Sequence, residues 1–251
     1  MSGAGTAAPP QLLTPEWPAP ARVRAAFTLR GGGVSGPPFG SLNVGAQVGD
    51  EPAAVAENRR RVRAALDLPA EPAWLEQVHG TRVADLDAGG AAAPADAVMT
   101  RVAGRVCAVQ VADCMPVLLA ARDASAVAVA HAGWRGLAAG VLEATVAALG
   151  VAARDLVAWL GPAISQPHFE VGAEVRQAFI GHDPGGGSAF TANARGRWQC
   201  DLAALARRRL AALGVTAVSG GTWCTYADPA RFFSFRRDGR CGRMAALIWL
   251  S

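Results

Sequence analysis

Short apolar runs, separated by polar or glycine-containing segments, dominate the hydrophobic pattern of this chain of 251 residues. Runs of this kind, rich in small and β-branched residues, are typical of buried strands when turn residues bound them. A proline follows Asp113-Cys114-Met115 and cannot continue a central ladder, so we expect a bend between the two runs that it separates. We predict strands over residues 23–29, 77–83, 105–111, 117–121, 126–130, 156–160 and 243–250.

Other stretches repeat apolar residues at helical spacing and therefore predict helices. Pro52, directly after an acidic residue, is typical of a helix start, and Asp201 is a residue type that caps helix N-termini. Gly150 and Gly214 follow two of the stretches, where glycine commonly ends a helix. We expect helices over residues 52–66, 134–149 and 202–213, and glycine-rich loops over 30–36 and 183–187, the second of them exposed.

These elements predict one mixed α/β domain over residues 21–251, because no repeat and no proline-rich linker divides this part of the chain. Residues 1–20 are rich in alanine, proline and glycine but lack the basic start and apolar core of a signal peptide, so we expect a flexible leader. The apolar segment 106–132 is interrupted by charged residues and is not typical of a membrane span. We therefore expect a cytoplasmic protein.

All 24 basic residues are arginine, since the sequence contains no lysine. This composition excludes a lysine Schiff base, pyridoxal phosphate chemistry and a lysine general base. The net charge of +4 is mild, the arginines are scattered, and there is a single tyrosine. A nucleic-acid-binding protein usually has a basic stripe or interleaved aromatic residues, so we expect anionic small molecules as ligands instead.

The candidate chemistry lies in three short motifs, each of which combines a metal-capable or nucleophilic side chain with a chain bend. Two of the only four histidines, His79 and His131, lie in such settings, with Cys114 between them in sequence. Two imidazoles and a thiolate suit zinc or copper, and three protein ligands leave a position open for substrate. The neighbouring Asp113 could orient a histidine through its second ring nitrogen. The motifs are Gln77-Val-His79-Gly80, Ala112-Asp-Cys114-Met-Pro116 and His131-Ala-Gly-Trp-Arg-Gly136.

The same residues also permit a site without metal, in which Cys114 is a nucleophile activated by His131 or His79. In that case Asp113 would cap a turn. The sequence does not decide between the two interpretations. The other four of the five cysteines are expected to be buried small apolar residues, and no Cys-x-x-Cys pair predicts a zinc ribbon or a thioredoxin motif.

Arginines near these motifs are candidates for binding phosphate, because the planar guanidinium matches a pair of phosphate oxygens. Arg30 and Arg135 each lie in a glycine-rich turn. Asn43 could contact a sugar or base, although an Asx turn is the alternative. A C-terminal cluster could likewise bind phosphate or form a solvated loop; it comprises Arg236, Arg237, Arg240 and Arg243.

Ordered motifs over nearly the whole chain past the leader resemble those of one known family. They are Phe27-Thr-Leu-Arg30 with Gly32-Gly-Val-Ser35, Ser41-Leu-Asn43-Val-Gly45, the three motifs above, Gly161-Pro-Ala-Ile164, Phe169-Glu-Val-Gly172 and Phe233-Ser-Phe-Arg-Arg237. The sequence is similar to the YfiH-type laccase-domain proteins, also labelled polyphenol oxidases or peptidoglycan-editing factors. The resemblance implies an α+β fold, a layered α/β/β/α sandwich of mixed sheets with helices outside.

The resemblance further implies a purine nucleoside phosphorylase that also acts as adenosine deaminase and methylthioadenosine phosphorylase. It implies a zinc or copper ion held by His79, Cys114 and His131, with purine nucleosides and phosphate as substrates. The family often has Cys-Tyr-Glu where this chain has His168-Phe169-Glu170, so His168 is not assigned as a ligand.

Two reactions in these labels conflict with the residues present. Four histidines without a His-x-His pair cannot build the several copper centres of a multicopper oxidase, so any phenol oxidation would be weak chemistry of a single adventitious copper. The His-x-Glu and Pro-Cys-x-x-Cys signature of zinc deaminases is also absent, so deamination would need a different arrangement. Rival hypotheses are a cysteine amidase or hydrolase that edits peptidoglycan precursors, and a metal-storing or partner-binding module without turnover.

Overall fold

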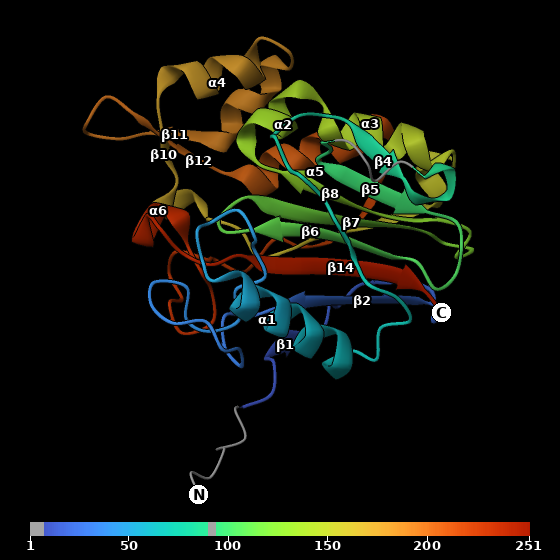
Figure 1. Ribbon diagram of the computed structural model, residues 1–251. Helices are drawn as coiled ribbons and strands as arrows, with labels where there is room; N and C mark the ends of the chain where they lie inside the picture. The colour runs from blue at the N-terminus through green and yellow to red at the C-terminus, as the bar shows by residue number, and fades with distance from the viewer. Residues whose placement is uncertain (1–7, 90–93) are drawn as a thin grey trace, which may run out of the picture.

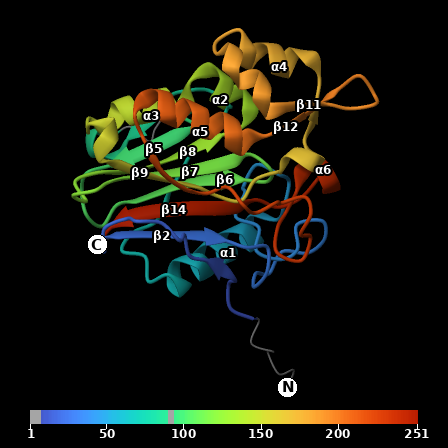
Figure 2. The same ribbon diagram turned by 180° about the vertical axis from the view of Figure 1, so that it is seen from behind.

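The computed structural model describes residues 8–89 and 94–251, and these form a layered sandwich of helices, two large sheets and further helices (Figures 1 and 2). Helix α1 (Pro52–Ala65) covers the outer face of the first sheet, and α3 (Val141–Leu149) and α5 (Leu202–Leu213) cover the outer face of the second (Figure 1). The predicted α/β/β/α sandwich is confirmed.

The first large sheet has five strands in the order β1-β2-β14-β6-β3 and the second has six in the order β13-β9-β7-β8-β5-β4. The first consists of β1 (Leu12–Leu13), β2 (Val23–Thr28), β14 (Met244–Leu250), β6 (Val106–Val111) and β3 (Ala73–Trp74). The second consists of β13 (Ala217–Gly220), β9 (Leu156–Leu160), β7 (Met115–Ala121), β8 (Val127–Ala132), β5 (Ala97–Thr100) and β4 (Val83–Asp85).

A smaller lobe lies beside the second sheet's helices and contains a three-stranded sheet in the order β10-β12-β11 (Figure 1). The strands of this lobe are β10 (Glu170–Val171), β12 (Trp198–Cys200) and β11 (Phe190–Ala192), and its helix is α4 (Ala173–Ile180). The remaining helices are α2 (Trp134–Ala139), α6 (Phe235–Asp238) and the 3-10 turns Leu86–Ala88, Ala153–Asp155, Gln166–His168 and Pro184–Ala189. No helix in the described part of the chain is long and apolar enough to cross a membrane.

Strands buried on both faces explain why the apolar runs in the sequence are continuous. In β7, Leu118 and Ala120 pack between the two large sheets, whereas Val117 and Leu119 pack under the helices of the second sheet. The first sheet repeats this pattern, with alternate residues of β14 facing the inter-sheet core or helix α1. The fold therefore has three apolar layers, and every position of the central strands β7, β8, β9 and β14 is buried.

The strands predicted around residues 23–29, 105–111, 117–121, 126–130, 156–160 and 243–250 are confirmed, as are the first and third helices. The helix predicted over 134–149 is broken into α2 and α3, because Gly140 takes a left-handed φ of 104° between them. The strand predicted over 77–83 is wrong up to residue 82, because these residues form a loop and only Val83 begins β4, but the bend expected at His79 is present, with His79 in the left-handed region. The segment 183–187 is a 3-10 turn with Gly186 buried, not an exposed loop.

The expected flexible leader is partly wrong as well. Leu12 and Leu13 form β1, which pairs antiparallel with Phe27 and Thr28 of β2, so this part of the leader belongs to the first sheet. Residues 1–7 of the leader lie outside the described residues. Sequence composition missed this strand because a two-residue edge strand has too short a pattern to detect.

The predicted bend before Pro116 is confirmed and has a larger effect than the sequence indicated. It carries the chain from β6 in the first sheet to β7 in the second. Asp113 takes a φ of 83° within the bend, and Pro116 is the second residue of β7, where it pairs with His131 of β8. Cys114 is thereby placed next to the end of β8.

Candidate active site

Three side chains from distant parts of the chain meet beside the ends of β7 and β8. The ligand atoms of His79, Cys114 and His131 all lie within 4.8 Å of one another. His131 is buried near the end of β8, Cys114 is half-buried in the bend before β7, and His79 is exposed on the loop before β4. The cluster predicted from the sequence is therefore assembled by the fold.

The donor atoms of this cluster are close enough to share one metal ion. Cys114 Sγ lies 3.9 Å from His79 Nε2, close to the separation of about 3.5 Å between two ligands of tetrahedral zinc. The rings of His79 and His131 meet edge to face, with centroids 4.8 Å apart. The cluster supplies three donors, so a bound ion would keep one position for substrate.

Gly133, directly after β8, leaves the space that the cluster occupies. A Cβ at this position would lie 2.8 Å from Cys114 Sγ and 3.1 Å from His79 Cδ2. The backbone of Gly133 is extended, with φ −64° and ψ 158°, so steric room rather than backbone freedom is what the position requires. This glycine follows His131 in the motif that the sequence indicated.

A carboxylate that the sequence did not indicate connects the two histidines. Asp96 is completely buried directly before β5, and its Oδ1 lies 2.8 Å from His131 Nδ1. Its two oxygens also accept hydrogen bonds from the backbone N–H groups of Val78, His79 and Gly80, at 3.1, 2.9 and 2.6 Å. Asp96 therefore contacts both the ring of one histidine and the backbone of the loop that carries the other.

A second anchor holds the His79 loop against the first sheet. The Gln77 side-chain amide donates to the Gln110 carbonyl at 2.9 Å and accepts from the Gln110 N–H at 2.7 Å. Together with Asp96, this pairing supports the left-handed backbone of His79, which has a φ of 61°. A non-glycine residue in that region needs such support, because the conformation is unfavourable.

The electrostatics of the cluster favour a thiolate. Burial raises the pKa of the Cys114 thiol, but the facing His131 and His79 rings outweigh burial and lower this pKa to about 6. Burial lowers the pKa of His131, but the Cys114 thiolate and the Asp96 carboxylate outweigh it and raise this pKa to about 9. A thiolate is the form of cysteine that binds metals and attacks electrophiles, so the shifts suit both interpretations of the site.

The cluster opens into a cleft of about 710 Å³. Four arginines line the cleft, and each guanidinium carbon lies over an aromatic ring that also lines it, at 4.2 to 5.9 Å from the ring centroid. The pairs are Arg59 with Trp74, Arg135 with Trp134, Arg236 with Phe169, and Arg243 with Phe235. The cleft thus combines flat apolar surfaces with positive charge, which suits an aromatic ligand that carries or accompanies an anion.

Two residues predicted to bind substrate do not reach this cleft. Arg30 donates to the carbonyls of Gly40 and Pro229 and lies over the ring of Phe233. Asn43 is fully buried: its Oδ1 accepts from the Gly45 and Arg243 N–H groups, and its Nδ2 donates to Asp50. The Asx turn was the alternative for Asn43, and it is the arrangement observed.

Asp113 lines the cleft but does not orient a histidine. Its carboxylate accepts from Thr225 Oγ1 and from the backbone N–H of Arg236, both at 2.6 Å. It therefore fixes the start of α6 beside the cleft, which is close to the turn-capping role considered from the sequence. The residue that orients His131 is Asp96 instead.

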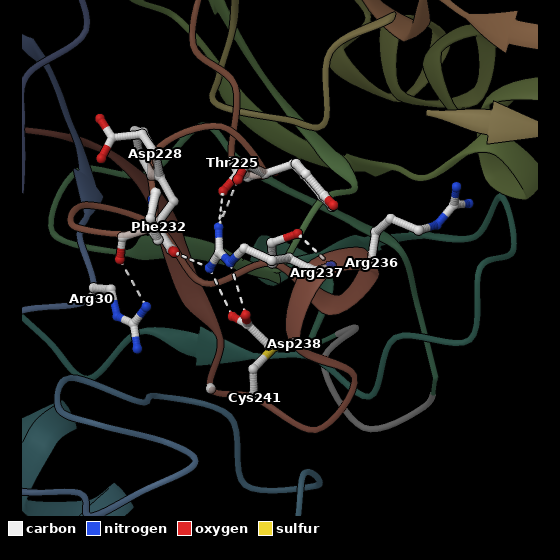
Figure 3. A network of polar contacts seen from close by, with 12 residues as sticks. Arg30, Thr225, Asp228, Phe232, Arg236, Arg237, Asp238 and Cys241 are labelled. Atoms are coloured by element: carbon white, nitrogen blue, oxygen red, sulfur yellow. Dashed lines mark hydrogen bonds and ion pairs between the residues drawn. The ribbon is translucent and has the colours of Figure 1, made fainter. Parts of the chain in front are cut away.

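The C-terminal arginines divide into two groups. Arg236 and Arg243 line the cleft, as a phosphate-binding role would require. Arg237 instead donates to the carbonyls of Thr225, Tyr226 and Phe232 and pairs with Asp238 (Figure 3). Arg240 donates to the Gly49 carbonyl, so it also connects loops.

The layered fold and the cleft beside it place this chain among proteins with a His-Cys-His site that could hold a metal ion. Residues 24–251 match the family described as multi-copper polyphenol oxidoreductase laccase, and the chain belongs to this family. The described residues contain one group of side chains arranged to hold a metal, so the family description exceeds what this site offers.

Relatives align over nearly their whole length. A purine nucleoside phosphorylase of Pseudomonas aeruginosa is 54% identical over 239 residues, which cover 95% of this chain and 98% of the relative. The purine nucleoside phosphorylase YfiH of Escherichia coli K12 is 50% identical over 241 residues, covering 96% and 99% of the two chains. The crystal structure of Neisseria meningitidis protein NMB0706 superposes with a TM-score of 0.92 at 48% identity, covering 96% of this chain and 99% of that one.

Proposed function

We propose that this protein is a metal-dependent purine nucleoside phosphorylase. The observation that carries the proposal is the cleft in which the His79, Cys114 and His131 donors open onto arginines stacked on aromatic rings. The names of the relatives that align over nearly both whole chains support the same activity. His79, Cys114 and His131 would hold a zinc or copper ion, which would supply Lewis-acid polarisation at its open position.

Arg135 is the residue we assign to phosphate. It is exposed at the cleft, and the described residues give its guanidinium no hydrogen-bond partner, only the face of Trp134 at 4.5 Å. Its free fork can therefore bind two phosphate oxygens. The aromatic rings of the cleft offer stacking surfaces for the purine base.

Phosphorolysis requires these groups to hold two substrates in line. A phosphate oxygen forms a bond to C1′ while the bond from C1′ to the base nitrogen breaks, and the purine leaves with the electron pair and then takes up a proton. Positioning of phosphate against C1′ by Arg135 converts a reaction between two free molecules into one within a complex. Positive charge from the cleft arginines stabilises the phosphate anion that attacks and the purine anion that leaves.

We extend the proposal to adenosine deamination and to phosphorolysis of methylthioadenosine in the same cleft. Deamination replaces the amino group of the base with oxygen from water and releases ammonia. Because the chain lacks the usual zinc-deaminase signature, this reaction would have to use the His79, Cys114 and His131 cluster. The cleft would accept these substrates because each carries the same purine ring.

Product analysis tests the proposal. Zinc-loaded protein is incubated with adenosine, inosine or methylthioadenosine, with and without phosphate, and the products are separated by chromatography. We expect free base and a sugar 1-phosphate only when phosphate is present, and inosine from adenosine without it. Cys114→Ala should abolish both activities, whereas Cys224→Ala, whose half-buried thiol lies outside the cleft, should retain them. Unchanged nucleosides with folded, zinc-loaded protein would exclude the proposed activity.

A second candidate function is a cysteine amidase or hydrolase acting on peptidoglycan precursors. The supporting observation is the contact of Cys114 with two imidazoles: its Sγ lies 3.9 Å from His79 Nε2, and His131 lies in the same cluster. Burial raises the pKa of the thiol, but the two histidines outweigh burial and lower it to about 6, as a nucleophilic thiolate requires. This function would survive a chelator and be lost on alkylation of Cys114. Activity lost on chelation and restored by zinc would instead favour the phosphorylase.

A further inference from the structure

The carboxylate of Asp96 has an unusual environment for a group that does not itself face the cleft. It is completely buried, and four N–H groups point at its two oxygens: one from the His131 ring and three from consecutive backbone positions, 78–80. An ionised carboxylate is only an acceptor and offers about four lone-pair positions. All of them are used here, so Asp96 is fully satisfied without water.

This arrangement determines which nitrogen of His131 carries a proton. Because the Asp96 oxygens only accept, His131 Nδ1 must donate its N–H to Oδ1 across 2.8 Å. In the neutral ring the other nitrogen, Nε2, is then unprotonated, and only an unprotonated nitrogen can bind a metal. Asp96 therefore selects the His131 tautomer with its proton on Nδ1, which leaves Nε2 free to bind a metal.

The same carboxylate also determines the position of the other histidine. Three successive N–H groups converge on Asp96 only if the chain turns around it, and His79 adopts its left-handed φ of 61° at the centre of that turn. A further contact ties the two histidine segments together, because the His131 backbone N–H donates to the Asp96 carbonyl at 2.7 Å. A shift of Asp96 would therefore move both ligands at once.

We propose that Asp96 is the positioning residue of the metal site, which fixes the tautomer of His131 and the turn that presents His79 in a single set of contacts. The inference rests on the metal dependence proposed above and adds a residue outside the three ligands to it. Asp96 touches neither substrate nor metal in this scheme. It acts through the two histidines, so its removal should weaken metal binding before it affects chemistry.

Asp96→Asn distinguishes positioning from simple burial, because the amide has nearly the same shape but one donor group. If the Asn amide nitrogen replaces Oδ1, it donates to His131 Nδ1, so the neutral ring carries its proton on Nε2, which then cannot bind metal; the amide also opposes the His79 N–H. If the amide nitrogen replaces Oδ2 instead, it opposes the N–H groups of Val78 and Gly80, and the His79 loop must move. Either orientation disturbs at least one histidine ligand.

The experiment measures zinc affinity by competition with a chromophoric chelator, alongside the thermal midpoint. We expect Asp96→Asn to raise the zinc Kd about 10- to 100-fold, the range seen when outer partners of metal ligands are removed. Asp87→Asn is the matched control: this partly buried carboxylate accepts from Thr100 and Arg101 near the other end of β5 and contacts no ligand. It should leave the zinc Kd within about twofold of wild type. Wild-type zinc affinity in folded Asp96→Asn would overturn the proposal.

The protonation of the His131 ring in the wild-type protein tests the proposal independently of whether Asp96→Asn folds. In ¹⁵N-labelled, zinc-loaded protein, the His131 ring should show a protonated Nδ1 and a metal-bound Nε2, with its signals assigned by their loss in His131→Gln. An unprotonated Nδ1, or no zinc binding at all, would overturn the inference. Zinc binding that depends on Asp96 without any nucleoside turnover would leave the inference standing and exclude the proposed phosphorylase activity.

Discussion

Substitution of Gly133 by alanine is the sharpest steric perturbation of the metal site. The backbone of Gly133 is extended and accepts any residue, so the change adds one methyl group without backbone strain. That methyl group would lie 2.8 Å from Cys114 Sγ and 3.1 Å from His79 Cδ2. Non-bonded atoms rest at about 3.5–4.0 Å, so the sulfur must retreat by roughly 1 Å.

A displacement of this size exceeds what a metal site tolerates, since ligand distances must hold to within about 0.2 Å. Overpacking by one methyl group typically costs about 1–3 kcal/mol. If this strain falls on the ligands, zinc affinity should drop about 5- to 150-fold, at about 1.4 kcal/mol per factor of ten. Nucleoside turnover at limiting zinc should fall in parallel.

The assay is chelator competition for zinc together with thermal unfolding of the metal-free protein. Gly36→Ala is the control, because a Cβ there meets no atom within 4 Å, and it should retain wild-type zinc affinity. Wild-type zinc affinity and turnover in Gly133→Ala would refute the view that the three donors occupy the space beside Gly133. A large loss of unfolding temperature in the metal-free protein would indicate that the methyl group disturbs packing beyond the ligands.

Further predictions concern the thiolate, the phosphate residue and a buried amide. In chelator-treated protein, the alkylation rate of Cys114 should reach half its maximum near pH 6, because burial raises the pKa of the thiol but the two histidines outweigh burial. An alkylation rate that increases only above about pH 8 would indicate an unperturbed thiol and contradict this prediction. Arg135→Ala should raise the KM for phosphate about 10-fold or more through loss of a charged hydrogen bond, with a smaller effect on nucleoside KM; an unchanged phosphate KM would remove Arg135 from its assigned role. Asn43→Ala should lower the free energy of unfolding by about 2–3 kcal/mol in urea titrations, because it leaves the Gly45 and Arg243 N–H groups without their acceptor. A loss of zinc affinity without a loss of stability would contradict this structural role.

Local pattern predicted most of the large elements because the central strands are buried on both faces. Val117–Ala121 and Met244–Leu250 are apolar throughout, which a strand between two packed layers requires. The break at Gly140 escaped the prediction because the apolar spacing continues across it, and only the left-handed φ separates α2 from α3. Short edge strands such as Leu12–Leu13 offer no periodicity to detect.

The candidate site was predictable where a residue stands in a distinctive motif and not where its role depends on distant contacts. His79 and Cys114 lie at bends, whereas His131 lies within β8 near its end, and the fold brings the three together as expected. Asp96 lies in a run of small and apolar residues, and its only signal in the sequence is an acidic side chain directly before an apolar strand. Its function becomes visible once β5 and β8 pair and place it beside His131.

Arg30 shows the opposite error, in which a conspicuous residue has a structural role. Its place in a glycine-rich turn suggested phosphate binding, but its guanidinium joins two loops through the Gly40 and Pro229 carbonyls. A guanidinium that donates to backbone carbonyls and one that binds phosphate look alike in a sequence. Only the surrounding acceptors distinguish them, and these come from segments far apart in the chain.

The most direct measurement titrates zinc into chelator-stripped protein while sugar 1-phosphate release from adenosine and phosphate is followed. We predict that the rate rises with added zinc and reaches a plateau at one equivalent per chain, and that Cys114→Ala stays inactive throughout. Full turnover in the stripped protein, or none at saturating zinc, would contradict the claim that His79, Cys114 and His131 form the metal centre of a nucleoside phosphorylase.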